Sequence, residues 1–221
     1  MRTLRLIKPP IESKRRICGL YAITPEEADT GRLVRKVVAA LEGGAAVVQY
    51  RAKQASPALA QIQALELQRR CQDFGVPLII NDSVELALAT GAQGVHLGRL
   101  DGAIDQARKK MPDAIIGVSC YNSLDLASDA VEQGADYVAF GSYFPSATKP
   151  AALRANVGLL RCARGQGYNT VAIGGITCDN AGTLIAGGAD AIAVINALFG
   201  SNDTAQIRAT AQTFTRHFCD A

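Results

Sequence analysis

The sequence predicts a single (β/α)8 barrel of the TIM type, and three observations support it. The chain has 221 residues, a length suited to one such barrel. Short apolar runs alternate with longer segments of helical period, which is typical of a parallel sheet covered by helices. A Gly-Ala pair recurs where a helix gives way to a strand. Because no Pro/Gly/Ser-rich linker divides the chain, we expect one catalytic domain over residues 17–221.

Each apolar run is short and largely apolar, as expected for a strand buried on both faces. The predicted strands are Gly19–Thr24, Ala45–Arg51, Pro77–Asn81, Gly94–Leu97, Ala114–Ser119, Tyr137–Gly141, Thr170–Ile173 and Ala191–Ile195. The predicted helices are Gly31–Glu42, Pro57–Phe74, Val84–Thr90, Ile104–Met111, Ser123–Gln133, Asn156–Gln166, Asn180–Ala186 and Thr204–Phe218. Eight strands in one domain favour a closed barrel over an open sheet.

A small internal repeat marks the junctions between helices and strands. Glycine followed by alanine occurs at Gly44, Gly91, Gly134 and Gly188, each time just before a predicted strand. A glycine there ends a helix through a left-handed residue, so its recurrence predicts repeated helix–turn–strand units.

The net charge of +3 arises in the first residues of the chain. Residues 1–16 hold six Lys and Arg side chains against Glu12 alone, so the remaining chain is slightly acidic. We interpret residues 1–16 as a basic lead-in that covers the bottom of the barrel, with a transit peptide as the alternative for so short and basic a segment. Since a nucleic-acid-binding protein would carry its basic residues on the folded body, we expect no nucleic-acid partner. No apolar stretch is long enough to cross a membrane, so we expect no membrane partner either.

The six cysteines show neither C-x-x-C pairs nor zinc-ligand spacing. Most lie in apolar runs, where a free cysteine behaves as a small hydrophobic residue. Free thiols fit a reducing compartment, and we expect a cytoplasmic protein. The sequence leaves the oligomeric state open, homo-oligomers included.

Polar side chains follow nearly every predicted strand, where the active sites of such barrels lie. Asp82 and Asp101 follow neighbouring strands and form a candidate magnesium pair, because Mg²⁺ takes one or two carboxylates beside substrate phosphates. The alternative for Asp82 is an N-terminal cap on the following helix. Arg51, Lys53 and Lys149 supply cations suited to a pyrophosphate, although a solvated loop would also explain the first two.

Two further patterns limit the chemistry. Gly174-Gly175 would let backbone approach a phosphate after the seventh strand, although glycine pairs also form plain turns. His96 lies inside a strand and is better explained as a packed, hydrogen-bonded residue than as a base. No sequence neighbour would activate Cys120, and no nucleophile–histidine arrangement is evident, so covalent hydrolysis is disfavoured.

The ordered segments GLYAIT, VVQYRAK, LIINDSVELALA, GVHLGRLDG, IIGVSCY, GADYVAFGSYFPSATKP and VAIGGI resemble the thiamine phosphate synthase family. The resemblance runs from about Gly19 to Phe199. It implies that a pyrimidine pyrophosphate and a thiazole phosphate condense to thiamine phosphate and pyrophosphate, in a dissociative substitution assisted by Mg²⁺.

The resemblance also implies residue roles. The positions matching the pyrimidine pyrophosphate site are Gln49, Tyr50, Arg51, Ala52, Lys53, Asn81, Ser119 and Lys149, of which Arg51, Lys53, Ser119 and Lys149 are expected to act in catalysis. Asp82 and Asp101 match the magnesium ligands. The thiazole phosphate pocket matches Ser146, Ala147, Thr148, Gly175, Ile195 and Asn196.

Several positions depart from the family pattern. Leu100 replaces a frequent carboxylate, and Pro25, Arg99, Ser146 and Asn196 replace frequent aspartate, glutamine, threonine and serine. None removes a charged group assigned to the chemistry, so we expect metal binding to survive.

Two other functions stay open. A thiazole tautomerase-like isomerase of a related barrel subgroup would have a histidine soon after the fifth strand, where Ser119-Cys120-Tyr121-Asn122 has none. A non-catalytic barrel that binds a thiamine precursor is favoured only by Leu100 and Asn196.

Overall fold

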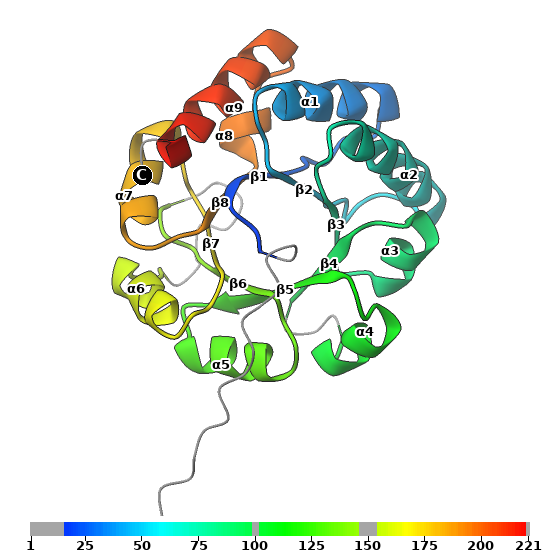
Figure 1. The fold of residues 1–221 in the computed structure, drawn as a ribbon. Coiled ribbons are helices and arrows are strands. Elements are labelled where there is room, and N and C mark those ends of the chain that lie inside the picture. Colours follow the sequence, from blue (N-terminus) through cyan, green and yellow to red (C-terminus); the bar gives the residue numbers. More distant parts are fainter. Residues whose placement is uncertain (1–15, 99–101, 146–153, 220–221) are drawn as a thin grey trace, which may run out of the picture.

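The computed structural model describes residues 16–98, 102–145 and 154–219, and its strands form one closed parallel barrel (Figure 1). The strand order around the barrel follows the sequence, with β8 paired to β1. The strands are β1 (Gly19–Ile23), β2 (Val47–Tyr50), β3 (Leu78–Asn81), β4 (Gly94–Leu97), β5 (Ile115–Tyr121), β6 (Tyr137–Phe140), β7 (Thr170–Ile173) and β8 (Ala191–Val194). The predicted fold class is therefore confirmed.

Helices surround the strands as an outer ring, as Figure 1 shows. They are α1 (Thr30–Glu42), α2 (Pro57–Asp73), α3 (Val84–Thr90), α4 (Ile104–Lys110), α5 (Leu124–Glu132), α6 (Val157–Gly165), α7 (Cys178–Ala186), α8 (Asn196–Phe199) and α9 (Thr204–Cys219). The sequence did not predict α8, because a four-residue helix is too short for a helical period to appear. No helix in the described ranges is long and apolar enough to span a membrane.

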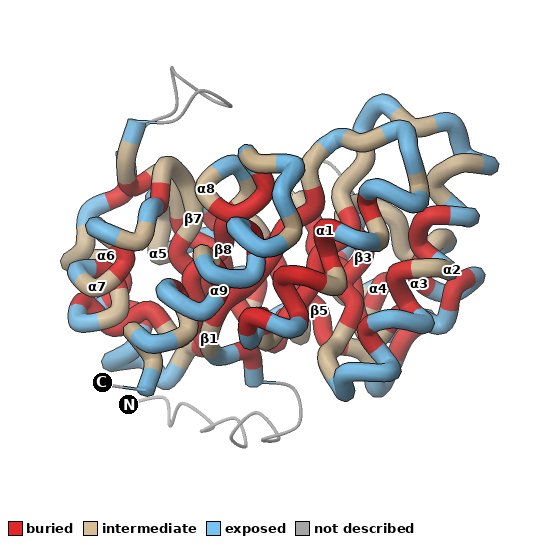
Figure 2. The backbone as a smooth tube through the Cα atoms, turned by 90° about the horizontal axis from the view of Figure 1, so that it is seen from above, coloured by how far each residue is buried: buried red, intermediate tan, exposed pale blue. Residues whose placement is uncertain are grey.

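The barrel has two hydrophobic cores, one inside the ring of strands and one between strands and helices. Tyr21 on β1 and Tyr137 on β6 touch although their strands are not neighbours, so the cluster they share fills the interior. The larger cluster includes Leu20 and Ala22, which alternate with Tyr21 and face the helices. Figure 2 shows buried residues along the strands and exposed ones on the outer faces of the helices.

The recurring Gly-Ala junctions carry a second function beyond ending helices. All four glycines have positive φ, as predicted. In three of the junctions, the polar side chain after alanine accepts a hydrogen bond from the backbone N–H of the preceding strand. Leu78 donates to Gln93 at 2.9 Å, Ile116 to Asp136 at 2.8 Å and Thr170 to Asp190 at 2.7 Å. The repeat therefore fastens neighbouring strands at their amino ends.

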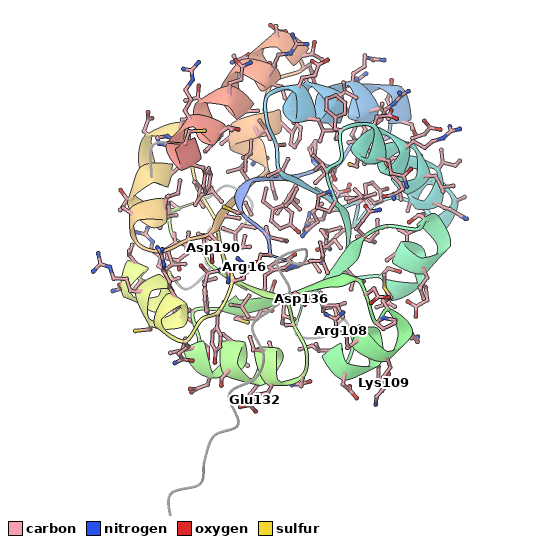
Figure 3. The ribbon with its side chains drawn as sticks, viewed as in Figure 1. Arg16, Arg108, Lys109, Glu132, Asp136 and Asp190 are labelled. Atoms are coloured by element: carbon pink, nitrogen blue, oxygen red, sulfur yellow. The ribbon has the colours of Figure 1, made fainter. Side chains whose placement is uncertain are left out.

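Arginine side chains reinforce these junctions at the same end of the barrel (Figure 3). Arg108 ion-pairs with Asp136 and donates to the carbonyl oxygens of Ala114 and Gly134. Arg16 ion-pairs with Asp190 at 3.3 Å. Beside it, the backbone N–H and carbonyl of Ile17 both bond to the Asn169 side chain. The rest of the basic lead-in, residues 1–15, lies outside the described residues.

Replacing Asp136 with alanine should lower the free energy of unfolding by about 3 kcal/mol, because Arg108 loses its carboxylate partner and Ile116 its acceptor. Replacing Gln93 with alanine removes a neutral acceptor and should cost about 1 kcal/mol. Urea denaturation of both variants measures the difference. Equal losses would show that the charge of Asp136 adds nothing to the junction.

Candidate active site

The carboxyl ends of the strands carry most of the predicted site residues that the structure describes. Arg51 and Lys53 follow β2, while Asn81 ends β3 and Asp82 follows it. Lys53 Nζ lies 3.2 Å from Asp82 Oδ2, which joins a predicted pyrophosphate cation to a predicted metal ligand. The Lys53 side chain is 56% exposed and that of Asp82 30%, so both reach solvent at this rim.

The end of β1 holds the loop that carries the two cations. Thr24 Oγ1 accepts from the backbone N–H of Arg51 at 2.9 Å and donates to the Arg51 carbonyl at 3.2 Å. Glu26 accepts from the backbone N–H of Lys53 at 2.9 Å and lies 3.6 Å from the Arg51 guanidinium. Sequence reasoning missed both residues. The available signal was a threonine at the end of an apolar run, followed two residues later by an acid.

Asp82 is held in an unusual backbone conformation. Its φ is +65°, which few residues other than glycine adopt, although aspartate does so more often than most. Its backbone N–H donates to the His96 carbonyl at 2.8 Å. The cap of α3 is Ser83, whose hydroxyl accepts from Leu86, so the alternative of Asp82 as the cap is wrong. Strained residues of this kind gather at functional sites.

The donor set at this rim suits Mg²⁺. Asp82, one of the two predicted ligands, presents carboxylate oxygens at the rim, and carboxylates are hard ligands that Mg²⁺ takes. Among the described residues, no group of three or more His, Cys, Asp and Glu side chains converges. A magnesium ion needs only one or two carboxylates, with substrate phosphates and water completing its shell. The Asp82 carboxylate therefore fits the predicted magnesium site, while Asp101 lies outside the described residues.

Gln49 and Ser119 reach the site from inside the barrel. Gln49 is 3% exposed, and its amide bonds to Tyr21 in the interior. Ser119 Oγ lies 2.9 Å from His96 Nε2. His96 is buried and hydrogen-bonded on both ring nitrogens, so its interpretation as a packed residue is confirmed.

Tyr50 points the other way from Gln49. Its hydroxyl donates to Gln63 on α2 at 2.8 Å, between the sheet and the helices. Tyr50, Ala52 and Asn81 line a cavity of about 250 Å³ together with residues of α2 and α3. The Tyr50 side chain is thus separated from the interior that Gln49 faces.

The opposite part of the rim holds Gly175, Ile195 and Asn196. Gly175 has φ +65°, and a Cβ there would lie 2.4 Å from the Pro145 carbonyl oxygen. A Cβ on Gly174 would meet the Ser142 hydroxyl at 2.2 Å. The glycine pair therefore makes room for residues 142–145 of its own chain. Ile195 precedes α8 and Asn196 begins it.

Several predicted residues are not placed. Asp101, Ser146, Ala147, Thr148 and Lys149 lie outside the described residues, as do Arg99 and Leu100. Their roles stay predictions.

Cys120 has no feature of a nucleophile. It is fully buried, and burial raises the pKa of its thiol to about 12. A thiol that stays protonated at neutral pH is a poor nucleophile, which agrees with the sequence interpretation.

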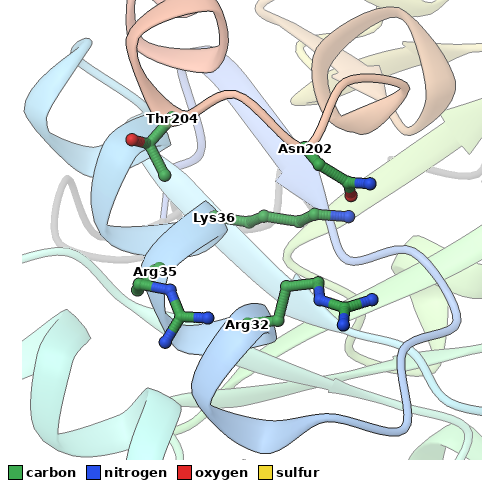
Figure 4. Close-up of a pocket in the computed structure, with 5 residues that line it drawn as sticks. All are labelled: Arg32, Arg35, Lys36, Asn202 and Thr204. Atoms are coloured by element: carbon green, nitrogen blue, oxygen red, sulfur yellow. The ribbon is translucent and has the colours of Figure 1, made fainter.

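A separate basic pocket of about 370 Å³ lies between α1 and the start of α9 (Figure 4). Arg32, Arg35, Lys36, Asn202 and Thr204 line it. Glu27 lies 3.6 Å from the Arg32 guanidinium and 3.7 Å from Lys36 Nζ, so a carboxylate of the chain already offsets part of this positive charge. The pocket contains none of the residues predicted for the strand-end site.

Comparison with known proteins gives one consistent result. Residues 20–198 match the family model of thiamine monophosphate synthase. The chain is 54% identical over 211 residues to the thiamine-phosphate synthase of Methylobacillus flagellatus, covering 95% of this chain and 97% of that protein. It is 53% identical over 202 residues to that of Thiobacillus denitrificans, covering 90% and 94%.

Among solved structures, the thiamine phosphate pyrophosphorylase from Pyrococcus furiosus superimposes with a TM-score of 0.82 at 34% identity. The match covers 94% of this chain and 98% of that one.

The two hydrogen bonds between Thr24 and the Arg51 backbone should help to position the loop after β2. Replacing Thr24 with valine keeps the shape but removes both hydrogen bonds to Arg51, so turnover of a pyrophosphate substrate should fall about tenfold. Thr90 to valine is the matched control, because it removes a buried hydroxyl on α3 that bonds within its own helix. Steady-state kinetics of both variants test this, and an equal loss in the control would contradict a specific role for Thr24.

Proposed function

The chain belongs to the thiamine monophosphate synthase family, and on that premise we propose how its strand-end rim makes thiamine phosphate. The protein is a transferase. Its proposed substrates are the 4-amino-2-methylpyrimidine that carries a diphosphomethyl group and the 4-methylthiazole that carries a phosphooxyethyl group. The products are thiamine phosphate and pyrophosphate.

One observation carries this proposal: a cation that follows β2 pairs with a carboxylate that follows β3. Lys53 Nζ lies 3.2 Å from Asp82 Oδ2, and Thr24 holds the backbone of Arg51, two residues before Lys53. Asp82 would hold Mg²⁺, and a diphosphate bound at this rim would meet the Lys53 ammonium beside it. This arrangement supports a site that binds a leaving pyrophosphate, because planar and point cations stabilise phosphate charge by charge-assisted hydrogen bonds.

The proposed reaction is a dissociative substitution. The carbon–oxygen bond between the pyrimidine methylene and pyrophosphate breaks, and its electron pair leaves with pyrophosphate. The electron-rich ring spreads the positive charge left on the methylene. The lone pair of the thiazole nitrogen then forms the new carbon–nitrogen bond. Such a reaction requires no protein nucleophile, in keeping with the protonated Cys120 thiol.

The chain's own residues would bind and orient the two substrates and neutralise the charge of the leaving pyrophosphate. Arg51, Lys53 and Lys149 would hold the diphosphate while its negative charge grows. Asp82 and Asp101 would hold Mg²⁺, which supplies further charge neutralisation to the leaving group when bound. Gln49, Asn81 and Ser119 would orient the pyrimidine. Ser146, Ala147, Thr148, Gly175, Ile195 and Asn196 would hold the thiazole phosphate on the other part of the rim.

A cytoplasmic location completes the proposal. Its support is that all six cysteines are free, which fits a reducing compartment.

The direct experiment is incubation of the protein with both substrates and Mg²⁺. We expect thiamine phosphate and pyrophosphate in equal amounts, and loss of both on chelation of the metal. Binding of both substrates without product would overturn the synthase proposal and favour a non-catalytic binding barrel.

Replacement of Asp82 tests the proposed ligand. Asp82 to asparagine keeps a residue that tolerates positive φ but removes the carboxylate charge, so magnesium-dependent turnover should fall by about a hundredfold or more with little change in stability. Glu85 to glutamine is the control, because it removes an exposed carboxylate of α3 that pairs with Lys110. Unchanged turnover in the Asp82 variant would remove Asp82 from the metal site.

A further inference from the structure

Five side chains form a continuous run of hydrogen bonds through the barrel, here named the interior chain. Gln49 Nε2 donates to the Tyr21 hydroxyl at 2.9 Å, and the Tyr21 and Tyr137 hydroxyls lie 2.8 Å apart. The Tyr137 hydroxyl lies 2.9 Å from His96 Nδ1, and His96 Nε2 lies 2.9 Å from Ser119 Oγ. The interior chain thus connects two predicted pyrimidine-binding residues, Gln49 and Ser119, across five strands.

The interior chain is shielded from water. Tyr21 and Tyr137 have no exposed surface, and His96 is only 8% exposed. Burial raises the pKa of both phenols well above the ordinary tyrosine value, so each keeps its proton and donates one hydrogen bond. A buried donor or acceptor left unsatisfied destabilises the fold, so the donors and acceptors along the interior chain must match.

This matching gives the interior chain a direction. The Gln49 NH₂ group only donates, so Tyr21 accepts from it and directs its own proton to Tyr137, its other hydrogen-bond partner in the described part of the chain. Tyr137 then donates to His96 Nδ1. A neutral imidazole that accepts on Nδ1 carries its proton on Nε2, which donates to Ser119. Ser119 therefore accepts a hydrogen bond from His96 and does not donate its own hydroxyl proton to it.

We propose that Tyr21 and Tyr137 are positioning residues, which hold His96 as the Nε2–H tautomer and so keep Ser119 as a hydrogen-bond donor for the substrate. This inference deepens the proposed function and rests on it, because it takes Ser119 to contact the pyrimidine. Ser119 would then favour a substrate that presents a hydrogen-bond acceptor to its hydroxyl. A substrate with a donor at that position would be disfavoured, because its proton would face the Ser119 proton.

The surrounding packing fixes the tyrosines where this role needs them. A Cβ on Gly117 would lie 1.8 Å from Tyr137 Cζ, so only glycine leaves room for the Tyr137 ring. The His96 ring stacks on Tyr137 with 5.6 Å between centroids, and Tyr21 meets Tyr137 edge-on at 6.0 Å. The Tyr137 ring is therefore held between Gly117, His96 and Tyr21.

The tautomer of His96 is measured by ¹⁵N NMR of the substrate-free protein labelled at its imidazole nitrogens. The chain has two histidines, and His217 to glutamine identifies the His96 signals. We expect a protonated Nε2 and an unprotonated Nδ1 in the wild type, with loss of this single state in Tyr137 to phenylalanine. A wild-type Nδ1–H tautomer, or an unchanged tautomer in the variant, overturns the inference whether or not the protein makes thiamine phosphate.

Kinetics test whether Tyr137 acts through Ser119. Tyr137 to phenylalanine should lower kcat/KM for the pyrimidine substrate about tenfold, and Ser119 to alanine by at least as much. The double variant should be no worse than Ser119 to alanine, since both changes remove the same donor. Losses that multiply would overturn the inference. Thermal melts confirm that each variant is folded.

Tyr143 to phenylalanine is the matched control. The Tyr143 hydroxyl is buried and has no hydrogen-bond partner among the described residues. Its removal should leave both turnover and the His96 tautomer at wild-type values. A tautomer change in this control would show that loss of a buried phenol anywhere disturbs the interior.

Discussion

Closing eight parallel strands into a ring forces every carboxyl end to one rim and every amino end to the other. The two rims can then serve different needs. At the amino ends, Gln93, Asp136 and Asp190 fasten β4, β6 and β8 to the strands before them, with Arg108 and Arg16 paired to the two acids. At the carboxyl ends, Lys53 and Asp82 meet from neighbouring strands and reach solvent. Stability and chemistry are thereby placed on opposite sides of one core.

The interior of the barrel carries polar contacts as well as apolar packing. Most of its side chains are aliphatic, but Tyr21 and Tyr137 carry hydroxyls across it to Gln49 and His96. In a medium of low dielectric constant these hydrogen bonds are strong, and a missing partner is costly. The need to satisfy every buried donor and acceptor can therefore also determine whether Ser119 donates or accepts its hydrogen bond with His96. The glycine at position 117 follows from this, since the Tyr137 ring occupies the space of any side chain there.

The sequence predicted the ring of strands because hydrophobic runs and Gly-Ala junctions are local signals, and both agree with the structure. It also placed Arg51, Lys53 and Asp82 at one rim, because strand ends follow from strand positions. It could not reveal the Thr24 and Glu26 contacts to the next loop, which depend on how neighbouring strand ends approach. Nor could it reveal that Tyr21, Tyr137 and His96 share hydrogen bonds, because β1, β4 and β6 are distant in sequence and are not paired in the barrel. Contacts between side chains on strands that are not paired produce no periodic pattern in the sequence.

Arg51, Lys53 and Asp82 are the proposed site for pyrophosphate together with Mg²⁺. Calorimetric titration of the protein with inorganic pyrophosphate, with and without Mg²⁺, tests it without requiring turnover. We expect saturable binding at a single site that strengthens strongly when Mg²⁺ is present, because Asp82 would hold the ion and the ion would neutralise pyrophosphate charge. Pyrophosphate binding of equal strength without Mg²⁺, or no binding under either condition, would contradict it.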